Sequence, residues 1–152
     1  MPDKHPSPMA LAIAEAEAAA GRGEVPVGAV LLDGASGEVL ARDHNRVEEL
    51  ADPTAHAELL VIRAVATRLG RKRLTGADLY VTLEPCPMCA QAIAFARLRR
   101  LYFGAYDPKG GGVEHGPRIF EQPTCHHRPE LVGGLDERRC GALLQGFFQQ
   151  RR

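Results

Sequence analysis

The chain has 152 residues, of which 45% are hydrophobic and 25% are charged, and its 19 Lys and Arg residues balance 19 Asp and Glu residues. This composition excludes a disordered chain and predicts one globular domain over residues 1–152 with a single core. The zero net charge gives no argument for a nucleic-acid partner, although local clusters such as residues 71–73 could still supply one. We see no signal peptide and no membrane-spanning run, so we expect a cytoplasmic protein whose four cysteines are thiols or metal ligands.

The N-terminal half of the chain is expected to form a helix, a β-hairpin and a second helix. These elements are predicted, in order, at residues 8–21, 25–32, 38–42 and 55–69, with a loop at 43–53. Ser7 and Thr54 are the expected N-caps of the two helices. Gly34 and Gly37 bracket the turn of the hairpin.

The C-terminal half is expected to continue the alternation of strands and helices. The order is a strand at 78–83, a helix at 87–97, a strand at 100–105 and a final helix at 136–150. The segment 107–128 is rich in Gly, Pro and His and carries no assignment. An alternation of strands and helices predicts right-handed crossovers and a partly parallel sheet.

Two thiols and one imidazole form the most informative pattern in the chain. Cys86 and Cys89 stand three residues apart, with Pro87 at the expected first helical position, and His56 lies near the start of the preceding helix. Successive helices on one face of a parallel sheet begin at the same edge, so the three side chains can converge on one Zn²⁺. Three protein ligands leave a fourth position for water, which is typical of a catalytic zinc site rather than a structural one.

Glu58 is the expected general base and general acid of this site. It follows His56 by two residues, which is about 200° around an ideal helix, so it should not ligate the metal beside His56. It can instead take a proton from water and return it to the substrate. A thioredoxin-like redox role for the two cysteines would leave His56 and Glu58 without a function, and a non-catalytic zinc module would not need Glu58.

These motifs resemble known enzymes. His56-Ala57-Glu58 followed by Cys86 and Cys89 resembles the signature of the cytidine deaminase-like zinc hydrolases. Further similarity to the bacterial tRNA adenosine deaminase family lies in segments 24–30, 44–46, 52–58, 79–86, 103–111 and 147–148. The resemblance implies a three-layer α/β/α fold, with a central mixed sheet of about five strands and helices on both faces.

The resemblance also implies an activity and a set of site residues. The expected reaction is hydrolysis of adenosine to inosine at the wobble position of a tRNA anticodon, by a homodimer with one zinc per subunit. His56, Cys86 and Cys89 match the family's zinc ligands, and Glu58 matches its proton shuttle. The expected substrate contacts are Val27, Asn45, Ala57, Asp107, Lys109, Phe148 and Arg152. Turn chemistry or core packing is the alternative for Asp107, Lys109, Phe148 and Arg152.

One segment departs from the family pattern. Family members often carry Ser-Leu-Met after the Gly-Gly run, whereas this chain has Gly112, Val113 and Glu114 there. That segment is expected to lie near the contacts with the anticodon loop. The alternative function is deamination of a free nucleobase or nucleoside, such as guanine or cytidine, by the same zinc site without a surface that contacts phosphate.

Overall fold

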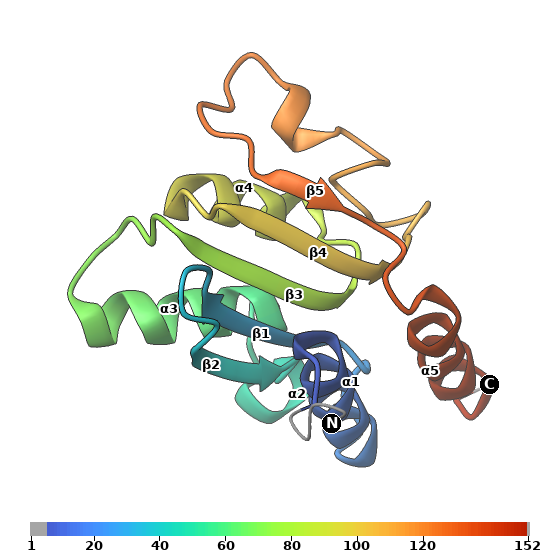
Figure 1. Cartoon of the computed structure of the whole chain (residues 1–152). Coiled ribbons are helices and arrows are strands. Elements are labelled where there is room, and N and C mark those ends of the chain that lie inside the picture. Colours follow the sequence, from blue (N-terminus) through green and yellow to red (C-terminus); the bar gives the residue numbers. More distant parts are fainter. Residues whose placement is uncertain (1–5, 152) are drawn as a thin grey trace, which may run out of the picture.

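A five-stranded sheet forms the centre of the computed structural model, which describes residues 6–151 (Figure 1). The strands are β1 Gly28–Asp33, β2 Val39–His44, β3 Ala77–Leu83, β4 Arg100–Ala105 and β5 Glu130–Val132. They lie in the order β2-β1-β3-β4-β5. β1 pairs antiparallel with β2 and β3, whereas β3, β4 and β5 run parallel. The predicted α/β class with a mixed sheet is confirmed.

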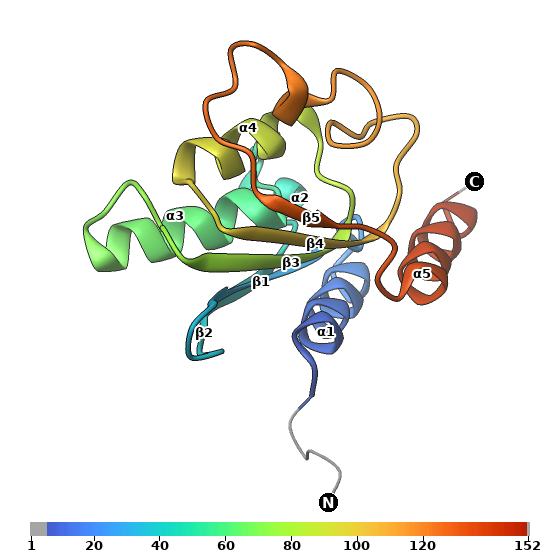
Figure 2. The ribbon, with the colours of Figure 1, turned by 45° about the horizontal axis from the view of Figure 1, so that its top comes forward.

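Helices cover both faces of the sheet (Figure 2). They are α1 Pro8–Gly21, α2 Val47–Leu50, α3 Ala57–Leu69, α4 Pro87–Ala96, the 3-10 helix η1 Ile119–Glu121 and α5 Glu137–Gln149. α3 and α4 pack on one face, while α1 and α5 pack on the other, which gives the predicted three layers. No helix between residues 6 and 151 combines the length and apolar character that crossing a membrane requires.

Side-chain alternation along the strands divides the core between these two faces. Ala29 and Leu31 of β1 face the larger cluster under α3 and α4, whereas Val30 faces the smaller cluster under α1 and α5. Successive residues of a strand point to opposite faces, so a strand buried on both sides must be apolar throughout. This explains the continuous apolar run from Ala29 to Leu32 in β1.

The start of α3 differs from the sequence prediction. The helix begins at Ala57, and the hydroxyl of Thr54 donates to Asp52 Oδ1 at 2.7 Å instead of capping the helix. The amide of Ala57 donates to Asn45 Oδ1 at 2.8 Å, so the cap comes from a side chain twelve residues earlier. The prediction of Thr54 as the N-cap was wrong because Asp52 forms a local turn that competes for it.

Three further boundaries differ from the expected ones. The loop predicted at 43–53 contains α2, and the unassigned segment after residue 107 contains η1, with β5 just beyond it. The first strand begins at Gly28 rather than at Val25, because Val27 N donates to Val25 O across Pro26 in a tight turn. Proline has no amide proton, so this stretch cannot extend the ladder.

Candidate zinc centre and active site

The carboxyl edge of β3 brings the three predicted zinc ligands together. His56 is the N-cap residue of α3, Cys86 is the N-cap residue of α4, and Cys89 lies in the first turn of α4. His56 Nδ1 lies 3.6 Å from Cys86 Sγ and 3.5 Å from Cys89 Sγ. Tetrahedral zinc, with Zn–S of about 2.3 Å and Zn–N of about 2.0–2.1 Å, requires about 3.6 Å between such atoms. The predicted ligand set therefore fits Zn²⁺.

In the metal-free site, some of the zinc-ligand side chains carry protons that zinc binding would displace. Hydrogen bonds from the Cys89 thiol and the His56 imidazole lower the pKa of Cys86 to about 4. The same contacts raise the pKa of His56, because its imidazolium faces the Cys86 thiolate. The pKa of Cys89 rises because its thiol donates to that thiolate and is buried. Metal binding therefore requires the release of protons from Cys89 and His56.

Glu58 is buried beside the three ligands but is not one of them. Its side chain lies in the first turn of α3, is only 4% exposed and lines the same cavity as His56 and Cys86. Burial, with a smaller contribution from the Cys86 thiolate, raises the pKa of Glu58 to about 7, although His56 opposes the shift. A carboxyl group with such a pKa can accept and release a proton near neutral pH.

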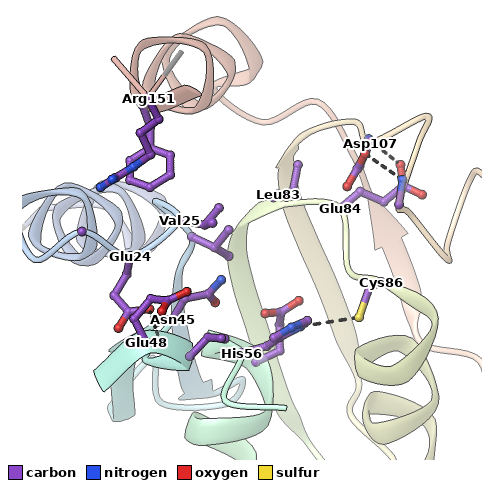
Figure 3. Close-up of a pocket in the computed structure, with 16 residues that line it drawn as sticks. Glu24, Val25, Asn45, Glu48, His56, Leu83, Glu84, Cys86, Asp107 and Arg151 are labelled. Carbon is purple, nitrogen blue, oxygen red and sulfur yellow. Dashed lines mark hydrogen bonds between the residues drawn. The ribbon is translucent and has the colours of Figure 1, made fainter. Parts of the chain in front are cut away.

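A cavity of about 630 Å³ opens next to these residues (Figure 3). Val27 and Asn45, both predicted as substrate contacts, line it and are almost fully buried. Asn45 Oδ1 accepts the amide of Ala57, which orients the side chain and leaves the Nδ2 hydrogens to donate elsewhere. Ala57 itself is fully buried in the core, where it holds Asn45 through its backbone.

Asp107 and Lys109 lie in a tight turn after β4. Asp107 lines the cavity, and its Oδ1 accepts the amides of Lys109 at 3.2 Å and Gly110 at 2.9 Å. Lys109 is exposed to solvent. The Asp107 side chain thus stabilises its own turn and also forms part of the cavity wall. Figure 3 shows Asp107, Glu84 and Cys86 on one side of the cavity and Arg151 on the other, with His56 below and between them.

The last helix approaches the cavity through different residues from those predicted. Phe148 is 50% exposed, and Arg152 lies outside the described residues. Phe147 and Arg151 line the cavity instead, with the Arg151 guanidinium 4.1 Å from the centre of the Phe147 ring. Buried Cys140 and Phe147 fall on the same side of α5 as Arg151, so a 3.6-residue period could have identified this face.

Two buried carboxylates also line the cavity and were missed by sequence reasoning. Glu24 accepts the backbone amides of Glu48 at 3.0 Å and Glu49 at 2.8 Å, which holds the first turn of α2. Glu84 binds the segment after Asp107. Their partners are 23 or more residues away in the sequence, so no local signal identifies them.

Comparison with known proteins supports the assignment of this site. The pattern of the family described as "Cytidine and deoxycytidylate deaminase zinc-binding region" matches residues 2–105. A tRNA-specific adenosine deaminase of Agrobacterium fabrum is 60% identical over 131 residues, which cover 86% of this chain and 85% of the relative.

Solved structures extend the likeness to the fold. A structure from a study of A-to-I editing by tRNA:A34 deaminases at the wobble position has a TM-score of 0.87 and 59% identity, covering 90% of this chain and 98% of that one. A guanine deaminase from Nitrosomonas europaea has a TM-score of 0.80 at 21% identity, covering 92% of this chain and 82% of that one. The second likeness concerns the fold alone.

Proposed function

The chain belongs to the family of tRNA-specific adenosine deaminases, and from this premise we propose that it hydrolyses adenosine to inosine at the wobble position of a tRNA anticodon. The observation that carries this proposal is the combination of 60% identity with an intact zinc-ligand set. His56, Cys86 and Cys89 supply that set, and the whole chain acts as one zinc-dependent deaminase domain.

Glu58 is the residue that moves protons in this proposal. Hydrolytic deamination adds water to C6 of adenine and expels ammonia, so a proton must pass from the water to the base. When bound, Zn²⁺ supplies Lewis acidity and lowers the pKa of water. Glu58 is buried next to the ligands and lines the same cavity, so its carboxylate can accept this proton and then donate it.

Asn45 and Val27 are suited to bind the adenine ring. The fixed Asn45 amide can donate from Nδ2 into the cavity, while Val27 offers an apolar wall on the same side. A base extruded from an RNA loop would bury its ring against such groups. Ala57 contributes by orienting Asn45, and Asp107 and Lys109 contribute to the outer wall, where neighbouring nucleotides would lie.

An anticodon loop is the proposed partner. Little free energy is needed to unstack a base in a single-stranded loop. Binding of such a loop can therefore be favourable although the protein has no net positive charge. Arg151 at the cavity and exposed Lys109 place positive charge where the RNA backbone would pass. We expect Phe148 and Arg152 to extend this contact.

We also propose a cytoplasmic homodimer. Phe95 on α4 is 71% exposed, which is unusual for a phenylalanine and supports contact with a second copy through this helix. A cytoplasmic location suits a tRNA substrate and the reduced state that the zinc thiolates require. Sedimentation analysis of the wild type and of Phe95→Asp tests the dimer, which the charged side chain should dissociate.

A direct competition among substrates tests the proposed reaction. An arginine tRNA anticodon stem-loop, guanine and cytidine are incubated separately with the zinc-loaded protein, and the products are measured by mass spectrometry after digestion. Inosine should form only in the RNA, at the wobble position. Conversion of guanine or cytidine without reaction of the RNA would replace this proposal with deamination of a free base or nucleoside.

A further inference from the structure

The carboxylate of Glu84 holds one wall of the cavity in place. Glu84 directly follows β3, is 1% exposed and accepts five hydrogen bonds from the segment 107–115. Its Oε1 binds the Asp107 amide at 3.0 Å and His115 Nδ1 at 2.9 Å. Its Oε2 binds the amides of Val113, Glu114 and His115 at 3.2, 3.0 and 3.1 Å. One buried side chain thus ties both ends of the segment together.

Two glycines allow the same segment to pack closely against the zinc-binding turn, which is the turn at residues 85–89. Gly112 N donates to Pro85 O at 2.8 Å, and a Cβ atom on Gly112 would lie 2.5 Å from Pro87 N. A Cβ atom on Gly111 would collide with Glu84 Oε2. Backbones can approach this closely only where the side chain is absent. The segment and the turn that carries Cys86 are therefore packed as one unit.

The tethered segment carries the cavity wall opposite Arg151. Asp107 and Gly110 line the cavity, and the Asp107 carboxylate holds the Lys109 and Gly110 amides in its turn. Glu84 holds the amide of Asp107, so the place of this turn relative to Cys86 is set by Glu84. Without that bond, residues 112–115 would still be held by Pro85 and Glu84, but the Asp107 end of the segment would lose its hydrogen bond to Glu84.

We propose that Glu84 is a positioning residue, which fixes the segment 107–115 against the zinc-binding turn so that RNA is held in register with the metal. This inference rests on the proposed function for its substrate, but not for the contacts that Glu84 makes. The hydrogen bonds of Glu84 go to residues 107–115 and not to the zinc ligands. It acts through Asp107 and the backbone that follows.

Glu84→Gln is the variant that separates this role from simple packing. Glutamine keeps the size of the side chain, but one of its two terminal atoms becomes a donor. If its oxygen faces Val113, Glu114 and His115, its NH₂ group confronts the Asp107 amide, which is itself a donor. The loss is therefore concentrated at Asp107, next to the cavity.

Asp78→Asn provides a matched control on the same strand. Asp78 is also buried, and its carboxylate accepts two hydrogen bonds from Arg99 at 2.9 and 2.7 Å. It lies at the opposite end of β3 from the zinc ligands. Loss of its charge should lower the melting temperature as much as Glu84→Gln does, without changing the cavity wall.

Hydrogen exchange and RNA kinetics of the zinc-loaded proteins give the two readouts. Loss of a charge-assisted hydrogen bond should speed amide exchange across 107–115 by about tenfold or more in Glu84→Gln. KM for the stem-loop should rise about tenfold while kcat falls less than about threefold, because the zinc ligands and Glu58 stay in place. Asp78→Asn should leave both quantities within about twofold of the wild type.

Exchange in 107–115 that stays at the wild-type rate in Glu84→Gln would overturn the tether. Faster exchange with an unchanged KM would overturn the positioning role. If Glu84→Gln fails to fold, His115→Ala removes the hydrogen bond between the partly exposed His115 side chain and the same carboxylate and should raise KM about threefold. If the wild type deaminates no RNA, the proposed function fails, while the exchange comparison still decides the tether.

Discussion

Residues up to 105 and residues from 107 onward build two different parts of the active site. The first part contains all three zinc ligands and Glu58, and it coincides with the region that the broad deaminase family shares. The second part supplies Asp107, Phe147 and Arg151 to the cavity wall and lies beyond that shared region.

The two parts have different roles: the first carries out the reaction, and the second mainly helps to select the substrate. The ligands lie at helix starts and are fixed by the core, because α3 and α4 bury their apolar sides against the sheet. The wall is fixed by few contacts, chiefly the hydrogen bonds to Glu84 and the packing of α5. Loss of a zinc ligand or of Glu58 should therefore abolish turnover, whereas changes in the second part should mainly alter RNA binding.

Cys86→Ala should have the largest effect on the first part. The variant loses a thiolate ligand, so zinc occupancy should fall to near zero and turnover should drop by about 10³-fold or more, the equivalent of several kcal/mol of lost Lewis acidity. Elemental analysis and deamination assays measure both. Cys125→Ala is the control, since this half-buried thiol lies outside the ligand set. A fully zinc-loaded Cys86→Ala protein would place the metal elsewhere.

Glu58→Gln should retain zinc and fold but lower kcat by about 10²- to 10⁴-fold, since general acid–base catalysis has that magnitude. Deamination rates at a saturating stem-loop concentration, together with the zinc content of the same sample, check this result. Glu48→Gln serves as a control, because Glu48 also lines the cavity but is exposed to solvent and has no proposed role in proton transfer. Near-normal turnover of Glu58→Gln would remove Glu58 from the mechanism.

The stability of the metal-free protein should depend on pH through Glu58. Its pKa rises from 4.5 to about 7 on folding, so the folded state binds the extra proton. The cost of the buried charge is absent below pH 4.5, grows from there to about pH 7 and is complete above it, at about 3 kcal/mol. Urea unfolding in the presence of a chelator should show this loss in the wild type and not in Glu58→Gln. Parallel pH profiles of the two proteins would contradict it.

Arg151→Ala tests the second part. The variant loses the cation–π contact with Phe147, worth about 0.5–1 kcal/mol, and a positive charge at the cavity. KM for the stem-loop should rise about two- to fivefold while kcat and zinc content stay constant. The KM of a Phe148→Ala variant is measured for comparison, because Phe148 lies on the exposed side of the same helix. A larger effect from Phe148 than from Arg151 would show that the RNA follows the outer side of α5.

Lys109→Ala should have the smallest effect. Loss of one phosphate contact weakens binding modestly and lowers the slope of log affinity against log salt by about 1. Filter binding of the stem-loop at several salt concentrations measures the slope. Lys72→Ala, in a basic cluster at the far end of α3, should leave it unchanged. An unaltered slope in Lys109→Ala would mean that this side chain does not meet a phosphate.

The first part of the site could be predicted from the sequence because its signals are local. Pro87 identifies the start of α4, Cys86 and Cys89 share its first turn, and the strand–helix alternation places His56 at the same edge. The alternation predicts the partly parallel sheet, whereas the five strands and the three layers are expected from the resemblance.

The remaining features depend on contacts between distant residues. Asn45 caps α3 from across a loop, and Glu84 meets partners up to 31 residues away. Thr54 was misassigned because Asp52 competes for it locally. Phe147 rather than Phe148 faces the cavity because the register of α5 is set by packing against β4.

The shortness of β5 has a consequence for solubility. Outer strands with many unpaired amides and carbonyls invite other chains to add to them and aggregate. Here the outermost parallel strand has only three residues, directly follows Pro129, and carries Glu130 in an ion pair with Arg100 at 2.6 Å. So short and charged an edge strand offers few free backbone groups to another chain, which protects this edge of the sheet against the addition of further strands.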